Sequence, residues 1–450
     1  MIDYQKQYQE KLTTPEEAVK IVKDGMWLDY AHAMSVPNLL DKALAARAEE
    51  LNEVYVRGYL IYHPIQILEA NVKLGRDVFV WNSWFMQSQD RRLSRESRAF
   101  FIPMRYAEQP EMYRRPEDVE TVDVLFLQTC PMDENGNFNL GPCIAQTREV
   151  INRAKYVVVE ANKNMPVVQG LSDDYINIKE VHAVVESDEP IDTIPTIQPD
   201  ETDEKIADML IKEIVDGATL QLGIGGMPNA LGYKIAESDL KDLGIHSEMY
   251  VDSMMAMTKA GVVTGMQKEL NRGKQVFSFS LGSKELYDWM DHNQALATAP
   301  VDYVNDPYVV SKMDNFIAIN NCVEIDLFGQ VNAETGGFNQ ISGTGGQLDF
   351  VMGAYMSKGG KSITAFQSSR IDKQGKMQSR IVPTLSPGTI VTDPRTTTHY
   401  VATENGIVNL KGKSTWQRAE ALISLAHPDA REELIKEAER LHIWRNSNKR

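Results

Sequence analysis

The chain has 450 residues, of which 42% are hydrophobic and 24% are charged, and its formal net charge is −16. This composition is ordinary for a soluble globular protein of about two to four domains. The net negative charge argues against an extended nucleic-acid-binding surface and against a surface that binds anionic membranes. A few local N–H groups and cations can still bind an anionic ligand.

The N-terminal residues lack the apolar core of a signal peptide, and no apolar run approaches the roughly 18 residues that a membrane span needs. The cysteines Cys130, Cys143 and Cys322 are widely spaced, and neither a Cys-x-x-Cys nor a His-Glu-x-x-His pattern occurs. We therefore expect a cytoplasmic protein with no metal site, no nucleic-acid partner and no membrane attachment.

The first half opens with a helix that is capped by Thr14 and Glu17 and ends at Gly25. An apolar run and the segment Pro37-Asn-Leu-Leu40 follow, and short apolar strands such as 156–160 alternate with helix-like runs. This alternation favours a parallel sheet that is covered by helices.

The second half repeats this order weakly. A helix that starts near Thr202 ends at Gly217, and an apolar run and Pro228-Asn-Ala-Leu231 follow. Two more pairs of segments match in the same order: 52–56 with 247–251, and 123–139 with 314–332. These ordered matches predict an internal duplication that gives two similar open α/β domains, each with a mainly parallel sheet covered by helices.

Prolines and acidic residues gather between residues 187 and 203, where they oppose regular structure. This segment is the expected join between the two copies. The predicted domains are therefore 1–190 and 200–450.

A glycine loop, Gly223-Ile-Gly-Gly-Met-Pro-Asn229, follows an apolar run at 218–222 and precedes a helix-like run. A strand that enters a helix through glycines exposes backbone N–H groups, which can bind an oxyanion or a phosphate. A tight packing turn is the alternative. The dinucleotide pattern Gly-x-Gly-x-x-Gly fails at Pro228, so the donors left are those of residues 225–227. The matching first-half segment 31–36 has no glycine.

Glu248 follows this loop in the strand-like segment 246–251. Its spacing alone is weak support, because the chain has 63 acidic residues and Glu53 occupies the matching place in the first half. The nearby anion site supports a catalytic role for Glu248, because a catalytic group needs partners. An anion site together with a carboxylate suggests acyl chemistry. No serine-elbow or cysteine–histidine pattern supports a hydrolase triad.

A second glycine turn, Ser342-Gly-Thr-Gly-Gly-Gln-Leu-Asp349, also precedes a helix-like run. It is either a flexible loop or a second backbone wall of the same pocket, and the residues do not decide between these interpretations.

Several of these stretches resemble one family, the acetyl-CoA hydrolase/transferase group of class I coenzyme A transferases. The likeness covers nearly the whole chain and is nearest to bacterial butyryl-CoA:acetate and 4-hydroxybutyrate CoA-transferases. The stretches that carry it are 220–230, 236–250, 340–350, 413–421, Trp81-Asn-Ser-Trp84 and 131–138. The resemblance implies that both domains have the CoA-transferase (NagB-like) fold, with the acyl or carboxylate side in the first and the catalytic glutamate and CoA loops in the second.

The resemblance also assigns roles to residues. The family's catalytic glutamate falls on Glu248. Its CoA-binding loop falls on Gly223, Ile224, Gly225, Gly226 and Met227. Further CoA contacts would fall on Val323, Gly346 and Lys373, with Arg370 or Arg380 as other candidates for the CoA phosphates.

The implied reaction moves CoA from a short-chain acyl-CoA, butyryl-CoA first, to acetate through a glutamyl-CoA thioester, with ping-pong kinetics. CoA would be substrate and product, with no permanently bound cofactor. The expected partners are acyl-CoA, acetate and short-chain carboxylates, in a homodimer or higher homo-oligomer that serves acetyl-CoA and butyrate metabolism in fermentation.

Alternatives stay open. The segments 30–36 and 62–66 depart from the near butyrate enzymes, so 4-hydroxybutyrate or propionate is also a candidate acid. An acyl-CoA hydrolase would use the same anion site with water as the acceptor. A non-catalytic CoA-binding protein is a further alternative.

Overall fold

The computed structural model describes residues 3–448, and these divide into two compact units. The first unit holds the described residues up to Pro195, Glu248–Val251 and Gln275–Val304. The second holds Thr196–Ser247, Asp252–Lys274 and the described residues from Asn305 onward. The division into domains 1–190 and 200–450 stays a prediction.

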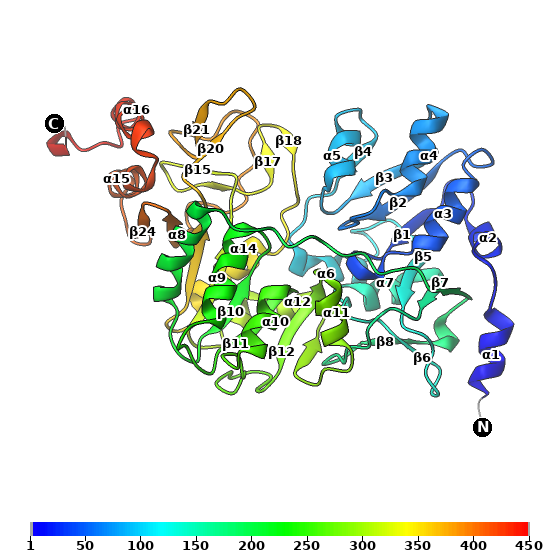
Figure 1. The fold of residues 1–450 in the computed structure, drawn as a ribbon. Helices are drawn as coiled ribbons and strands as arrows, with labels where there is room; N and C mark the ends of the chain where they lie inside the picture. Colours follow the sequence, from blue (N-terminus) through cyan, green and yellow to red (C-terminus); the bar gives the residue numbers. More distant parts are fainter. Residues whose placement is uncertain (1–2, 449–450) are drawn as a thin grey trace. The chain divides into compact units, whose positions relative to one another are not determined.

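A seven-stranded sheet in the order β4-β3-β2-β1-β5-β7-β9 forms the centre of the first unit, and every neighbouring pair is parallel (Figure 1). Its strands are β1 (Trp27–Tyr30), β2 (Val54–Gly58), β3 (Phe79–Ser83), β4 (Ala99–Phe101), β5 (Val122–Thr129), β7 (Ala154–Asn162) and β9 (Ala183–Ser187). All positions of β5 are buried, as expected for a central strand that is covered on both faces.

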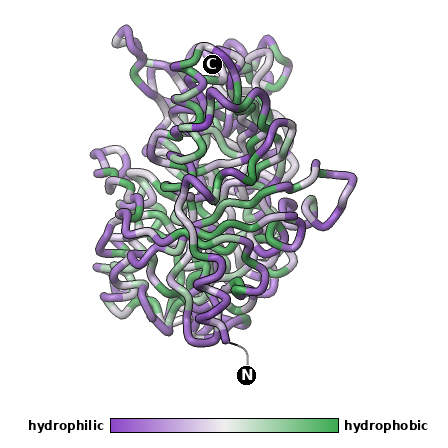
Figure 2. Tube along the Cα trace, turned by 90° about the vertical axis from the view of Figure 1, so that its right-hand side faces the viewer, coloured by the Kyte–Doolittle hydropathy of each residue, from purple (hydrophilic) through white to green (hydrophobic). Residues whose placement is uncertain are grey.

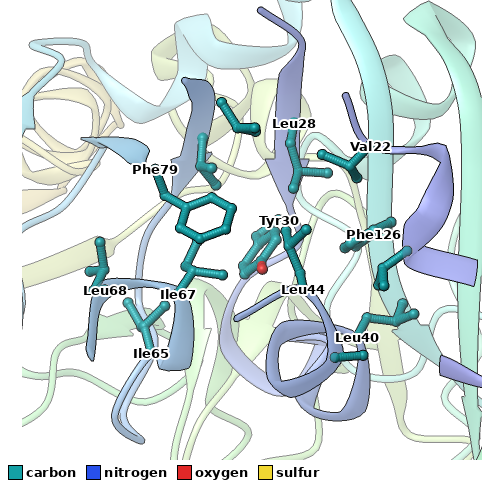
Figure 3. Close-up of a cluster of buried hydrophobic side chains, with 14 of the residues drawn as sticks. Val22, Leu28, Tyr30, Leu40, Leu44, Ile65, Ile67, Leu68, Phe79 and Phe126 are labelled. Carbon is teal, nitrogen blue, oxygen red and sulfur yellow. The ribbon is translucent and has the colours of Figure 1, made fainter. Parts of the chain in front are cut away.

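Helices cover this sheet, and their apolar faces form the core. In Figure 3, Leu28 and Phe126 from the strands lie among side chains of α3 and α4, including Leu44 and Ile67. The helices of this unit are α1 (Tyr4–Lys11), α2 (Pro15–Ala18), α3 (Asn38–Ala46), α4 (Gln66–Leu74), α5 (Ser88–Ser94), α6 (Gln109–Arg114), α7 (Thr147–Arg153), α11 (Lys284–Met290) and α12 (Val301–Val304). Thr14 caps α2 by accepting a hydrogen bond from the Glu17 N–H, as predicted.

The second set of parallel strands repeats the first. The strands pair in the order β11-β10-β14-β19-β23, which matches β2-β1-β5-β7-β9, and β12 pairs with β13 as β3 does with β4. Their bounds are β10 (Thr219–Leu222), β11 (Gly244–Tyr250), β12 (Gln275–Ser280), β13 (Leu296–Thr298), β14 (Phe316–Asn320), β19 (Lys361–Ala365) and β23 (Tyr400–Thr403). The predicted pair of similar open α/β domains is confirmed.

An antiparallel strand, β24 (Gly406–Asn409), extends the second unit beyond β23, and two C-terminal helices pack on this end around Leu422 and Leu434. The helices of this unit are α8 (Glu201–Leu210), α9 (Gly226–Ala236), α10 (Asp252–Lys259), α13 (Pro307–Val310), α14 (Gln347–Met356), α15 (Thr415–Leu425) and α16 (Pro428–Arg440). Figure 2 shows hydrophobic segments inside and hydrophilic loops outside. Within residues 3–448, no helix combines the length and apolar character that crossing a bilayer requires.

Short strands complete both units. They are β6 (Asn137–Asn139), β8 (Tyr175–Asn177), β15 (Glu324–Asp326), β16 (Val331–Asn332), β17 (Thr335–Gly336), β18 (Asn339–Gln340), β20 (Ser369–Ile371), β21 (Met377–Ser379) and β22 (Ile381–Val382).

A buried carboxylate closes the start of α3 in the first unit. The N–H groups of Leu39 and Leu40 donate to Glu160 Oε2 over 2.9 and 3.3 Å. Glu160 is fully buried in β7, and burial raises the pKa of its carboxyl group to about 7, against the opposing effect of these two hydrogen bonds.

We expect Glu160→Gln to change how stability depends on pH. The raised pKa means that the folded chain keeps a proton which the unfolded chain has lost, so this group's contribution to stability disappears as pH rises through about 7. Glutamine keeps an acceptor oxygen without ionising. The variant should therefore gain up to about 3 kcal/mol relative to the parent between pH 5 and pH 8.

Thermal midpoints of both proteins at the two pH values measure this gain. Glu17→Gln, which removes an exposed carboxylate paired with Lys20 in the same unit, is the matched control and should differ from the parent equally at both. An equal difference for Glu160→Gln as well would contradict the assignment.

Candidate functional site

The predicted glycine loop joins β10 to α9 in the second unit. Gly225 is the N-cap of α9 with a φ of 129°, a conformation that side chains disfavour, and no side chain caps the helix. Pro228 lies in the first turn, where a missing N–H is tolerated. The start of α9 therefore has the form of an anion site.

The loop glycines differ in what surrounds them. A Cβ on Gly226 would overlap the carboxylate of Asp203 in α8, and Gln367 donates to that carboxylate over 3.1 Å. A side chain at position 226 would therefore have to displace the Asp203 carboxylate. A Cβ on Gly223 would meet no atom within 4 Å, so the space beside Gly223 is open.

The equivalent segment of the first unit has no such opening. Residues Ala33–Ser35 form a short 3₁₀ turn, and the following helix α3 donates its first N–H groups to Glu160. The protein's own carboxylate thus occupies the place that an anion would take. This agrees with the sequence-based interpretation that only the second copy of the repeat offers an anion site.

The second glycine turn also opens a helix, because Gly346 is the N-cap of α14 and no side chain caps it. Side chains anchor the turn: Glu334 accepts from Gln340 over 3.0 Å and from Thr344 over 3.2 Å. The contact between Gln347 and Asp393 adds a further link of 2.7 Å. These contacts favour a fixed backbone wall over a flexible loop.

Val323 follows β14, and its N–H donates to the Asn332 carbonyl over 2.7 Å. Arg380 donates to the carbonyl groups of Cys322 and Val323 and to Asn321. Arg380, a candidate for CoA phosphate from the sequence, is thus engaged in holding this turn.

Lys373 lies in the exposed turn between β20 and β21, where Asp372 accepts from the N–H groups of Gln374 and Lys376. Arg370 of the same hairpin is also exposed. Both side chains are therefore available on the surface of the second unit.

The predicted CoA residues of the second unit follow neighbouring strands at one edge of the sheet. β10 and β14 are adjacent and parallel, and Gln221 and Asn320 exchange hydrogen bonds of 3.3 and 3.2 Å where these strands end. The glycine loop, Val323 and Lys373 come after the carboxyl ends of β10, β14 and β19 in turn. Ligands of open α/β sheets bind at this edge.

Glu248 is a half-buried residue near the end of β11, in the segment Glu248–Val251 that belongs to the first unit. Its neighbours Met249 and Tyr250 are buried, and Tyr250 donates its hydroxyl proton to Gln275 over 2.7 Å. The sequence suggested Met227, Met249 and Tyr250 as an apolar lining, and all three are buried.

Glu53 is not the structural counterpart of Glu248. Trp27 in β1 pairs with Tyr55, whereas the equivalent Thr219 in β10 pairs with Gly244. This register aligns Glu248 with Tyr59 and leaves exposed Glu53 ahead of β2. The sequence match of 52–56 with 247–251 was therefore wrong, because a short motif can repeat six residues out of register.

Sequence analysis missed a group of buried polar side chains in the first unit. Their positions in the chain are far apart, and none belongs to a recognisable motif. We call this group the tyrosine cluster; its members are His32, Tyr59, Tyr106, Gln109, Cys143 and Gln146.

The cluster surrounds the hydroxyl group of Tyr59. This oxygen lies 3.0 Å from Tyr106 Oη, 3.1 Å from Gln109 Oε1 and 2.9 Å from Gln146 Oε1. Tyr106 Oη lies 2.9 Å from His32 Nε2, and the His32 ring stacks on Tyr59 with 4.3 Å between centroids. Burial raises the pKa of Tyr106 well above its ordinary value, and the charges of neighbouring groups, Glu248 among them, add to this.

The cluster also contains a cysteine–histidine contact that the sequence pattern did not indicate. Cys143 Sγ lies 3.5 Å from His32 Nε2, but burial raises the pKa of the Cys143 thiol to about 12 and lowers the pKa of His32 to about 3. Both groups are therefore neutral at pH 7, and the thiol is 3.3 Å from the His32 carbonyl oxygen, which it faces as a donor. This pair is not an activated nucleophile.

Among residues 3–448, no three histidine, cysteine, aspartate or glutamate side chains gather in a way that would hold a metal ion.

Comparison with known proteins gives matches along the chain. The models of the acetyl-CoA hydrolase/transferase N-terminal and C-terminal domains match residues 1–195 and 282–438. The chain is 47% identical to the butyryl-CoA:acetate CoA-transferase of Anaerostipes caccae, covering 100% of both proteins. It is 38% identical to the 4-hydroxybutyrate coenzyme A transferase of Clostridium kluyveri, covering 97% of this chain and 99% of that protein.

Among solved structures, RipA from Yersinia pestis superimposes with a TM-score of 0.90 at 35% identity, covering 98% of this chain and 100% of that chain. Matches of this extent and identity extend over both halves of the duplicated fold. This chain belongs to the acetyl-CoA hydrolase/transferase family.

Proposed function

We propose that this enzyme transfers CoA from a short-chain acyl-CoA, butyryl-CoA first, to acetate through a glutamyl-CoA thioester on Glu248. The observation that carries the proposal is the half-buried Glu248 carboxylate at the carboxyl end of β11, in a chain 47% identical to a butyryl-CoA:acetate CoA-transferase. A carboxylate is already ionised at neutral pH and needs no base. The neutral Cys143–His32 pair offers no competing nucleophile.

In the first half-reaction, a Glu248 oxygen attacks the thioester carbonyl carbon, and the tetrahedral intermediate expels CoA as thiolate. The thiolate then attacks the glutamyl carbonyl of the resulting mixed anhydride, and the acyl group leaves as a free carboxylate. Acetate reverses these steps. One carboxylate enters and one leaves, so no net proton transfer is needed.

The oxyanion of each tetrahedral intermediate needs hydrogen-bond donors. We assign this role to the N–H groups of Gly226 and Met227 at the start of α9 and of Gly346 before α14, because both helices begin without a side-chain cap. Donors of this kind typically contribute about 10²–10³ in rate.

CoA itself is assigned to the second unit. The open space beside Gly223 admits a ligand close to the backbone, and Val323 borders the same edge of the sheet. Lys373 and Arg370 on the exposed β20–β21 hairpin are the cations assigned to its phosphates. We also propose a cytoplasmic homodimer or higher homo-oligomer, which rests on the sequence resemblance alone.

A second candidate substrate is a 4-hydroxyacyl-CoA. In the tyrosine cluster, Gln109 Nε2 is a buried donor without a hydrogen-bond partner, and the charge of Glu248 acts on Tyr106 of the same cluster. A substrate hydroxyl would satisfy such a donor, whereas a butyryl chain would not. The ratio of kcat/KM for butyryl-CoA and 4-hydroxybutyryl-CoA decides between them.

Glu248→Gln should lower kcat by at least about 10³-fold, because the amide cannot form the glutamyl thioester. Incubation with butyryl-CoA followed by borohydride should reduce Glu248 to an alcohol in the parent, seen by peptide mass spectrometry, and leave residue 248 unmodified in the variant. Glu53→Gln, at the mismatched sequence position, is the control and should keep parental activity. Full turnover by Glu248→Gln would remove the proposed nucleophile.

Gly223→Ala should keep the parental thermal midpoint, because the added methyl group meets no protein atom within 4 Å. If CoA lies against this backbone, the KM for butyryl-CoA should rise about tenfold or more, the cost of losing about 1.4 kcal/mol of binding. Steady-state kinetics with an unfolding scan test this. An unchanged KM would place CoA elsewhere.

Transfer and hydrolysis differ in their response to acetate. With butyryl-CoA and acetate together, we expect acetyl-CoA and butyrate to form at the same rate. Chromatography measures both products. With butyryl-CoA alone, little free CoA should accumulate. Rapid CoA release at the same rate with and without acetate, with no acetyl-CoA, would identify a hydrolase.

A further inference from the structure

Arg380 lies between β21 and β22 and braces the turn that follows β14. Its Nε donates to the Val323 carbonyl over 3.0 Å, and its Nη2 donates to Asn321 Oδ1 over 3.2 Å and to the Cys322 carbonyl. The Phe366 ring lies against the guanidinium, with 5.2 Å from Arg380 Cζ to the ring centroid. Three of the five N–H donors of this side chain are therefore used on uncharged oxygen atoms of one turn.

The main chain of Arg380 is fixed to a second segment. Its N–H donates to the Ser368 carbonyl over 2.9 Å, in the stretch that follows β19. The preceding residue, Gln367, donates its side-chain amide to Asp203 Oδ1 in α8 over 3.1 Å. The other oxygen of Asp203 lies against Gly226, where an added Cβ would come within 2.1 Å of it. Unbroken contacts thus lead from Arg380 to the glycine loop.

These contacts join three loops of the second unit. They are the glycine loop after β10, the Val323 turn after β14 and the segment after β19, which leads into the hairpin that carries Lys373. The proposed function assigns residues of all three loops to CoA. A ligand that contacts several loops at once binds best when their relative positions are set before it arrives, because ordering them on binding costs free energy.

We propose that Arg380 is a positioning residue for CoA, which acts by holding the backbone of Val323 in place rather than by pairing with a phosphate group. Gln367 has the same role for the glycine loop, because it links the segment after β19 to Asp203. This inference rests on the proposed function, since it takes Val323 and the glycine loop as CoA contacts. It differs from the phosphate contact that the sequence resemblance suggested for Arg380.

The two roles of Arg380 differ in what lysine can replace. A lysine ammonium keeps the positive charge that a phosphate contact needs, but it is a single point on a flexible stem and cannot span three oxygen atoms as the planar guanidinium does. A phosphate contact in solvent also weakens as salt is added, whereas contacts within a partly buried turn are screened much less. Retention of the charge and dependence on salt therefore distinguish the two roles.

The experiment uses the full-length protein and compares the parent with Arg380→Lys, Arg380→Met, Lys373→Gln and Arg418→Lys. Arg418 is the matched control, because it donates to the carbonyl groups of Phe328 and Arg395 over 3.2 and 2.7 Å and so braces a turn of the same unit that is not assigned to CoA. Calorimetry gives the Kd of CoA at about 0.1 M and about 1 M salt, where the Debye length is about 10 and about 3 Å. Steady-state kinetics with butyryl-CoA and a thermal midpoint complete each data set.

For Arg380→Lys we expect the Kd of CoA and the KM for butyryl-CoA to rise about tenfold relative to the parent, by the same factor at both salt concentrations, with kcat kept within about twofold. Arg380→Met should behave in the same way. Lys373→Gln, at a cation assigned to the phosphates, should show a rise in Kd that disappears at high salt. Arg418→Lys should lower the thermal midpoint and keep the parental Kd.

Two results would overturn the positioning role. One is a Kd near the parental value in Arg380→Lys together with a rise in Arg380→Met that shrinks at high salt, which identifies a phosphate contact. The other is a parental Kd in both Arg380 variants. If neither variant folds, Gln367→Met decides: a raised Kd supports the inference, and a parental Kd counts against it.

Trapping with borohydride separates this inference from the proposed function. Glu248 should be reduced in the parent and, at saturating butyryl-CoA, also in Arg380→Lys, because Arg380 affects the binding of CoA and not the nucleophile. A parental Kd in the Arg380 variants with trapping at Glu248 intact would remove the positioning role alone. Failure to trap Glu248 in the parent would instead count against the proposed function, whatever the Kd values.

Discussion

The first N–H groups of an α-helix have no partners within the helix, and this chain satisfies them in two ways. In the first unit, Glu160 accepts from the start of α3, whereas α9 and α14 of the second unit begin at glycines with no capping side chain. The chemistry that we propose depends on this difference. A helix start filled by the protein's own carboxylate cannot receive a ligand, and an open one can.

The duplicated sheets have also diverged at their strand ends. In the strand register, Tyr59 at the end of β2 is the counterpart of Glu248 in β11. One copy of the repeat therefore supplies a hydroxyl group at this position, and the other supplies a carboxylate. Tyr59 Oη lies 3.0 Å from Tyr106 Oη, the charge of Glu248 acts on Tyr106, and all three residues belong to the first unit. Divergence of equivalent positions has thus placed a charged group and its polar neighbours within one compact unit, although they come from different copies of the repeat.

Sequence was a good guide to the fold and to the glycine loop, because alternating apolar runs and a strand–glycine–helix junction are local patterns. Sequence analysis failed where a residue's position depends on which strands or distant segments pair in the fold. Glu53 was matched to Glu248 because a motif carries no register, and the Cys143–His32 contact joins residues more than a hundred positions apart. The role of Arg380 in holding the turn before Val323 was hidden for the same reason. Such contacts exist only once the sheet has formed.

The approach of Asp203 to Gly226 has a consequence for turnover. A fixed negative charge beside the first turn of α9 lowers the positive potential there and weakens the hold on any anion. The reaction exchanges one thioester for another of similar energy, and each catalytic cycle ends with the release of a product. Very tight binding of CoA would therefore bring little advantage. In the site that we propose, the Asp203 charge beside the start of α9 is therefore expected to ease the release of CoA.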